Sequence, residues 1–281
     1  MSKVLVTGAS GFIGRHLVPV LRAGGHEVIE ARRTAGDVAA AATWKQFPPA
    51  DAVVHLAAKS FVPESWEAPG LFLRTNLGGT VEAMEYCRAH GAHLVFPSSY
   101  MYGDAVRQPI AEDSALVAKN PYALSKKLAE EACAFYADRF GLAVTVLRPF
   151  NIYGPGQAEA FLVPTILRQL DAGQGIRVMD LEPRRDYVYI LDVVEAMVKA
   201  LSAPPGLNVF NIGSGTSHSV ADLIRIIQEV WGTSLPVSSE GVRRKDEIMD
   251  TVADIGRAGL KLGWTPRFTL RQGIEDLHAA P

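Results

Sequence analysis

The 281-residue sequence is poor in cysteine. It contains only Cys87 and Cys133, and both fall in stretches with helical periodicity. Two cysteines in such places do not make a disulfide framework, so we expect reduced thiols in a cytoplasmic protein. The sequence also lacks an excess of charge of either sign, because the formal net charge is only −2 at pH 7. A basic surface of the kind that binds nucleic acid is therefore not expected.

Long apolar runs are missing as well. No stretch has the length of a membrane span, and the first residues lack the charged and apolar segments of a secretory signal. We therefore expect no membrane partner. Hydrophobic residues nevertheless make up 48% of the chain, which is enough for one large domain or for a domain with a smaller lobe.

The N-terminal stretch has the order strand, glycine turn, helix. Residues 4–6 are apolar and predict a buried parallel strand, and glycines follow at positions 8, 11 and 14. In a dinucleotide-binding unit, Gly8 makes the tight turn, Gly11 admits a pyrophosphate and Gly14 allows close packing of helix on strand. Glycines at this spacing also occur in turns that bind nothing. The predicted cofactor contacts here are Gly8, Gly11, Phe12, Ile13 and Gly14.

The residues at the end of the second predicted strand, 26–31, help to predict whether the cofactor is NAD or NADP. This position often holds an acid that binds the ribose hydroxyls of NAD, but the chain has Arg32 and Arg33 there. Two guanidinium groups suit a 2′-phosphate, which favours NADP over NAD. The alternative is a solvated pair of arginines, with NAD bound through the backbone. Residues 36–38 predict a short third strand, with Asp37 near the adenine.

The following elements complete an α/β fold, a doubly wound parallel-sheet Rossmann domain with a smaller C-terminal substrate-binding lobe. We assign residues 1–154, with returning segments near 185–215, to the NAD(P)-binding domain, and most of 155–281 to a lobe rich in loops. A strand over 51–58 brings Leu56, Ala57 and Ala58 to the cofactor, and we expect His55 to be a packed residue. Further strands are predicted at 93–97, 144–147, 176–179, 209–211 and 235–237, and helices at 72–88, 121–140, 161–172, 190–201 and 220–231.

A serine, a tyrosine and a lysine form the candidate catalytic set. Ser98 follows the strand at 93–97, and Tyr122 and Lys126 share one face of a helix that Asn120 caps. The pKa of free tyrosine is about 10, and a nearby ammonium group lowers it. We predict hydride transfer between a carbinol carbon and a nicotinamide, with Tyr122 as acid or base and Ser98 as hydrogen-bond donor. Tyr122 and Lys126 alone would also fit an ordinary surface pair.

Taken in order, these motifs resemble the extended short-chain dehydrogenase/reductases, specifically the NAD-dependent epimerase/dehydratase family of nucleotide-sugar enzymes. The resemblance implies catalytic roles for Ser98, Tyr122 and Lys126, and substrate contacts from Ser99, Tyr100, Asn151, Arg185 and Arg244. It also implies a homodimer that pairs through the helices near 80–88 and 122–136. The matching segments are residues 7–14, 55–58, 98–103, 122–126, 148–156, 185–189, 211–215 and 262–266.

One departure from the family pattern reduces the number of reactions that fit this sequence. The 4,6-dehydratases of the family carry one or two acids directly after the serine, whereas this chain has Ser99 and Tyr100. This argues against dehydration, unless Tyr100 or Glu64 supplies a proton. C4 epimerisation and reduction of a 4-keto sugar remain, and Arg32 and Arg33 favour the NADP-dependent reductase. A catalytically silent dinucleotide sensor is a further alternative.

Overall fold

A parallel sheet forms the centre of the molecule. The computed structural model describes residues 1–103, 107–242 and 248–279. Within them, six strands pair in parallel in the order β2-β1-β3-β4-β5-β9. This is the predicted α/β Rossmann-like fold. The strand bounds are β1 (Lys3–Thr7), β2 (Glu27–Ala31), β3 (Ala52–His55), β4 (His93–Pro97), β5 (Val144–Pro149) and β9 (Leu207–Ile212).

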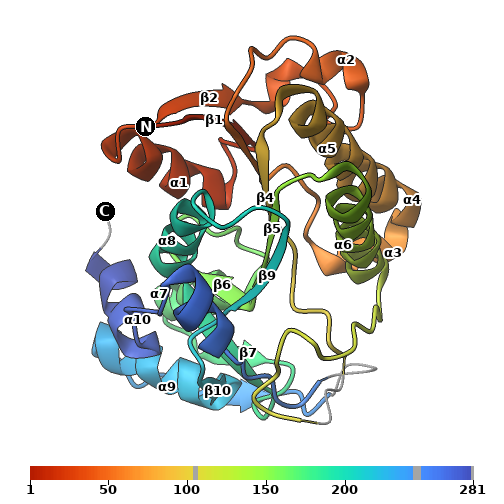
Figure 1. The fold of residues 1–281 in the computed structure, drawn as a ribbon. Coiled ribbons are helices and arrows are strands. Elements are labelled where there is room, and N and C mark those ends of the chain that lie inside the picture. Colours follow the sequence, from red (N-terminus) through yellow and green to blue (C-terminus); the bar gives the residue numbers. More distant parts are fainter. Residues whose placement is uncertain (104–106, 243–247, 280–281) are drawn as a thin grey trace.

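Helices cover both faces of the sheet (Figure 1). Helices α1 (Phe12–Ala23) and α8 (Ile190–Ala200) pack side by side on one face, and α5 (Gly79–His90) and α6 (Pro121–Phe140) on the other. Alternate side chains of a strand point to opposite faces, so Val4 and Val6 enter one apolar cluster and Leu5 enters the other. The buried strands are therefore apolar on both sides, as expected for a parallel sheet.

The C-terminal lobe contains two small sheets. Strand β8 (Arg184–Tyr189) lies between β6 (Asn151–Tyr153) and β10 (Ser217–Ser219), and β7 (Ile176–Val178) pairs with β11 (Val237–Ser239). Helices α7 (Leu162–Ala172), α9 (Val220–Trp231) and α10 (Leu270–Ala279) surround them. The lobe therefore has more regular structure than the predicted arrangement of loops.

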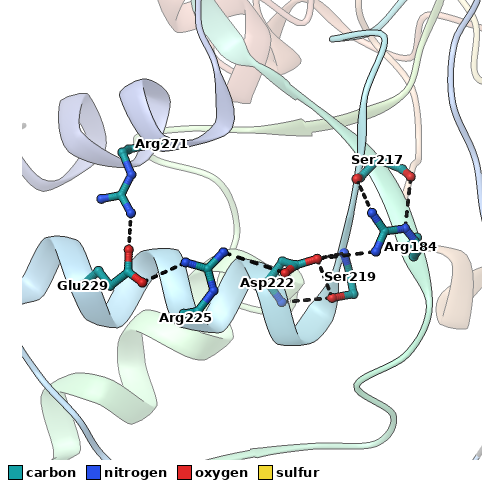
Figure 2. A network of polar contacts seen from close by, with 7 residues as sticks. All are labelled: Arg184, Ser217, Ser219, Asp222, Arg225, Glu229 and Arg271. Atoms are coloured by element: carbon teal, nitrogen blue, oxygen red, sulfur yellow. Dashed lines mark hydrogen bonds and ion pairs between the residues drawn. The ribbon is translucent and has the colours of Figure 1, made fainter.

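A chain of polar contacts ties the outer elements of this lobe together (Figure 2). It runs from α10 along α9 to the β8–β10 ribbon, through Arg271, Glu229, Arg225, Asp222, Arg184 and Ser217. Ser219 and Asp222 also form a capping box at the start of α9. Because these ion pairs lie at the surface, water and salt screen them and each adds little to stability.

Most of the predicted helices and strands correspond to observed elements. The strand at 93–97 and the helices at 121–140 and 220–231 are confirmed. The third strand at 36–38 is wrong, because the Asp37 carboxylate accepts a hydrogen bond from Ala39 N at 3.0 Å and the chain turns there. The helix predicted at 72–88 lies within a continuous helical stretch, which consists of α4 (Pro69–Phe72), a π-helical turn over Leu73–Gly78 and α5. The sequence did not indicate the π-helical turn.

Two short helices complete the described elements: α2 (Ala41–Trp44) and α3 (Val62–Glu67). Across the part of the chain that the structure describes, no helix combines the length and the apolar character that a membrane span requires.

Candidate active site

The glycine turn after β1 has no room for side chains. Gly8 has a φ of +65°, and a Cβ added to it would lie 2.8 Å from Ala57 N. A Cβ on Gly14 would lie 2.5 Å from the Gly8 carbonyl oxygen. Gly11 is the N-cap of α1 and has no side-chain cap, and Phe12 and Ile13 are the first residues of the helix. Bare backbone at a helix N-terminus fits a dinucleotide pyrophosphate, and the binding of a cofactor at this turn stays a prediction.

The end of β3 is joined to this turn by Thr7. Its Oγ1 lies 2.9 Å from His55 Nδ1 and accepts a hydrogen bond from Ala57 N at 3.1 Å. Burial lowers the pKa of His55 to about 3, so the imidazole is neutral at pH 7. His55 is thus a packed residue, as predicted. The structure places Leu56, Ala57 and Ala58 directly after it, next to the glycine turn.

An ion-pair cluster lies at the end of β2. Arg32 donates from Nε and Nη2 to Glu30 Oε2 at 3.1 and 3.0 Å, and Arg22 donates to Oε1 at 2.7 Å. The hydrogen bond from Arg32 lowers the pKa of the Glu30 carboxyl. Arg32 is therefore engaged with an acid, while Arg33 begins an exposed 3₁₀ turn. The sequence prediction of the cofactor rested on Arg32 and Arg33 and did not include Glu30.

Ser98 and Tyr122 lie where β4 ends and α6 begins. Ser98 is 4% exposed, and its Oγ has no hydrogen-bond partner among the described residues. Asn120 caps α6, with its Oδ1 accepting from Ala123 N at 2.8 Å, as predicted. The Tyr122 side chain is hydrogen-bonded to Ser99. A buried hydroxyl without a partner, such as that of Ser98, suits a bound hydroxyl or carbonyl group.

The ionisation of Tyr122 differs from the sequence prediction. Burial raises its pKa, and this outweighs the hydrogen bond with Ser99, which acts in the opposite direction. The predicted lowering by Lys126 is therefore wrong for this structure. The Lys126 ammonium group instead donates to the Pro97 carbonyl oxygen at 2.7 Å and lies 4.7 Å from the centre of the Phe96 ring. Burial lowers the pKa of Lys126 to about 8.

Two of the predicted substrate residues are in direct contact. Tyr100 donates its hydroxyl proton to Asn151 Oδ1 at 2.9 Å and stacks on Phe150 with ring centres 4.7 Å apart. Asn151 in turn donates from Nδ2 to the Asp186 carbonyl oxygen at 3.1 Å. This chain of contacts joins the segment after β4 to the small sheet of the lobe.

The two predicted arginines have different outcomes. Arg185 donates from Nη1 to the carbonyl oxygens of Arg184 and Ile248, at 2.8 and 2.6 Å. It thereby holds the chain directly after residue 247. Arg244 lies outside the described residues.

Two hollows on the lobe, of about 380 and 310 Å³, are lined mainly by residues of α9 and α7. Neither is lined by Ser98, Tyr122 or Lys126, so the candidate site is defined here by its glycine cradle and its side-chain contacts.

A comparison with protein families finds a match over the part of the chain that contains the candidate site. The model of the NAD dependent epimerase/dehydratase family matches residues 4–213. The chain belongs to this family. The matched residues of this chain run from β1 through β9 and include every predicted catalytic and cofactor residue.

Relatives within the family carry out different reactions. The GDP-6-deoxy-D-mannose reductase of Pseudomonas aeruginosa is 30% identical in an alignment 298 positions long, which covers 98% of this chain and 95% of that protein. The UDP-glucose 4-epimerase of Corynebacterium glutamicum is 32% identical in an alignment 313 positions long, which covers 99% of this chain and 95% of that protein. The solved structure of RMD from Pseudomonas aeruginosa with NADPH is 29% identical, covers 99% of this chain and 98% of its own, and has a TM-score of 0.90.

Two residues near the site were not singled out from the sequence. Asn76, on the π-helical turn, donates from Nδ2 to Ser125 Oγ at 2.8 Å, and Ser125 donates to the Tyr122 carbonyl oxygen at 2.7 Å. Asn76 thus braces the first turn of α6, and such π-helical turns are frequent at functional sites. Tyr187 is 5% exposed, and its hydroxyl has no partner in the described chain. The only signal for Asn76 was the pair of glycines that follows it.

Proposed function

We propose that this protein is an NADP-dependent reductase that acts at C4 of a 4-keto nucleotide sugar. The observation that carries the proposal is the buried, unpartnered hydroxyl of Ser98 at the end of β4, together with the half-buried Tyr122, whose phenol contacts Ser99. Reduction of a ketone requires a proton donor, and a phenol whose pKa is raised by burial keeps its proton at neutral pH. The 30% identity to a nucleotide-sugar reductase supports the same reading.

Each side chain has a defined task in this reaction. A bound NADPH would supply the hydride from its nicotinamide. Tyr122 gives its proton to the sugar oxygen as the carbonyl becomes an alcohol, and Ser98 donates a hydrogen bond to the same oxygen. Lys126, held by the Pro97 carbonyl, provides positive charge at the base of the site and can contact the nicotinamide ribose. Asn76 acts indirectly, by fixing the turn that carries Tyr122.

The preference for NADP over NAD belongs to this proposal. Arg32 and Arg33 stand at the end of β2, where a 2′-phosphate would lie, and guanidinium groups bind phosphate well. The fold matches a structure that contains NADPH with a TM-score of 0.90. Arg32 would have to exchange Glu30 for the phosphate, which its 65% exposed side chain allows.

The substrate side is assigned to the lobe. We propose that Asn151, Arg185 and Arg244 bind the diphosphate, and that Ser99 and Tyr100 contact the sugar. In domain terms, residues 1–154 with segments near 185–215 hold the dinucleotide, and most of 155–281 holds the nucleotide sugar.

A 4-epimerase is the second candidate, and Glu30 is the observation that favours it. An acid at the end of β2 suits the ribose hydroxyls of NAD, which an epimerase keeps bound through its cycle. The relative from Corynebacterium glutamicum is such an enzyme. Dehydration is less well supported, because Ser99 and Tyr100 offer no carboxylic acid beside Ser98.

We further propose a homodimer in the cytoplasm. Leu124, Phe135 and Phe140 of α6 are 41%, 56% and 52% exposed, and α6 lies beside α5, so this pair of helices presents apolar side chains to a partner. Both cysteines are free and buried, which is consistent with a reducing compartment.

The test is a product analysis combined with one substitution. Purified protein is mixed with NADPH or NADH and with UDP-, GDP-, dTDP- and CDP-linked 4-keto hexoses, and separately with the parent hexoses and oxidised cofactor. Tyr122→Phe removes the proton donor, so kcat falls by about 10²- to 10⁴-fold while cofactor affinity is unchanged. Tyr136→Phe on the same helix is the matched control, because its hydroxyl bonds only to Glu85, at 2.6 Å, among the contacts described.

Three results would contradict the proposal. A fully active Tyr122→Phe enzyme would remove the proton donor from the mechanism. Interconversion of parent hexoses without net change in nicotinamide absorbance would establish the epimerase instead. Tight cofactor binding with no turnover of any sugar would favour a sensor.

A further inference from the structure

Helix α6 carries a second charged residue into the interior. Glu130 lies one helical turn after Lys126, so the two side chains share a face of the helix. It pairs with Arg148 of β5, and both side chains are only 7% exposed. Arg148 Nε lies 3.1 Å from each carboxylate oxygen of Glu130, and Nη2 lies 2.6 Å from Oε2. The pair is therefore bidentate and well shielded from water.

Stability alone does not account for such a pair. Removing two charges from water costs several kcal/mol per ion, and apolar residues of similar volume often replace a buried pair without loss of stability. A buried pair that is retained is therefore a candidate for a positional role, and its other contacts indicate what it positions.

Arg148 also contacts the segment that follows Ser98. Its Nη1 donates to the Tyr102 hydroxyl at 2.9 Å and to the Glu112 carbonyl oxygen at 2.8 Å. Burial raises the pKa of Tyr102 to about 12, so this phenol keeps its proton and donates it to Asn211 Oδ1 at 2.5 Å. A continuous buried chain thus links α6 to the segment of Ser98, Tyr100 and Tyr102, and on to β9.

We propose that Glu130 and Arg148 are positioning residues that hold the turn of α6 with Tyr122 and Lys126 in register with the segment after β4, and that Glu130 sustains the positive charge of Lys126. This inference rests on the proposed function, because it takes Tyr122 and Lys126 as the residues that act at the nicotinamide and the sugar.

The surroundings of Lys126 define the electrostatic part of the proposal. From α6 it faces Glu130 and Cys133, from β4 the Pro97 carbonyl and the Phe96 ring, and from β3 the neutral His55. Burial raises the pKa of the Cys133 thiol, so this group is uncharged at pH 7. Among the described residues, Glu130 is thus the carboxylate that favours the charged form of Lys126, against the effect of burial. Without it, the pKa of Lys126 falls further and the ammonium group is lost at lower pH.

The first test measures this charge directly. The Cε resonance of Lys126 is followed through a pH titration by NMR of ¹³C-lysine-labelled protein and is assigned with Lys126→Met. Glu130→Gln should lower the pKa of Lys126 by about one unit or more. The control is Glu131→Gln, because Glu131 is 60% exposed and lies 4.0 Å from Lys127. An unchanged titration in Glu130→Gln would overturn the electrostatic part.

The second test measures position. Glu130→Leu combined with Arg148→Met replaces the pair by apolar side chains and should fold, even if Glu130→Gln alone does not. Loss of register should reduce kcat by about 10- to 100-fold and leave KM for the nicotinamide cofactor unchanged.

A folded double variant with the kcat of the wild type would overturn the positioning role. If the wild type itself turns over no nucleotide sugar, the proposed function fails. The NMR titration needs no substrate, so it still decides the role of Glu130.

Discussion

Asp186, in strand β8, organises the small three-stranded sheet of the C-terminal lobe, and replacing it gives the sharpest stability prediction. Its side chain is fully buried, and each carboxylate oxygen accepts two hydrogen bonds. Oδ1 accepts from Ser214 N at 2.6 Å and from Ser214 Oγ at 2.8 Å, and Oδ2 accepts from Gly215 N and Ala253 N, both at 3.0 Å. Segments that are distant in the sequence thus meet at one acceptor group.

Asp186→Asn preserves the shape and removes half of the acceptors. In the better orientation, the amide nitrogen faces Ser214, whose hydroxyl can rotate to accept, and Ser214 N is left without an acceptor. One unsatisfied buried N–H costs about 1–3 kcal/mol, and the remaining bonds lose their charge assistance at a further cost of about 1 kcal/mol. We therefore expect the free energy of unfolding to fall by about 2–4 kcal/mol.

Urea denaturation followed by tryptophan fluorescence measures this loss. Asp254→Asn is the matched control, because Asp254 accepts a surface hydrogen bond from Gly256 N at 2.9 Å that an asparagine can retain. The control should lie within about 0.5 kcal/mol of the wild type. If Asp186→Asn were as stable as this control, the account of Asp186 as an essential acceptor would be refuted.

Three further outcomes follow from the cofactor side and the core. Gly14→Ala places a Cβ 2.5 Å from a backbone carbonyl oxygen of the glycine turn, so we expect a loss of about 1–3 kcal/mol in stability and much weaker dinucleotide binding by calorimetry; normal binding would contradict the cradle. Arg32→Ala should weaken NADP binding more than NAD binding, because it frees Glu30 for ribose hydroxyls; equal losses would remove the basis for NADP. Burial raises the pKa of both cysteine thiols, so a thiol reagent should modify neither in the native protein and both after unfolding; rapid native labelling would contradict their burial.

Local signals made part of this structure predictable from the sequence. The glycine turn after β1 depends on residues within a few positions of one another, and so does the cap of α6 at Asn120. Helix α9 has its predicted bounds, and the structure shows that Ser219 caps its start and that Gly232, at a φ of +64°, ends it.

The missed features depend on contacts between distant segments or on burial. Asn76 and Ser125 are 49 residues apart in the sequence, and local sequence patterns do not predict a hydrogen bond between such distant residues. The pKa of Tyr122 was predicted in the wrong direction, because residue spacing indicates a neighbouring ammonium group but not the degree of burial. At residues 36–38 the carboxylate of Asp37 accepts a hydrogen bond from the backbone N–H of Ala39, and the chain forms this local turn in place of the expected strand.

The larger apolar cluster has a mechanical consequence. It is continuous between the Rossmann sheet and the lobe, since Leu17 of α1, Ile166 of α7 and Trp264 belong to the same buried group. The chain also returns from the lobe to add β9 to the edge of the sheet. The two parts therefore share one interior rather than meeting at a hinge, so they should melt in a single cooperative transition. Substrate entry would then depend on loop rearrangement and not on the opening of one half away from the other.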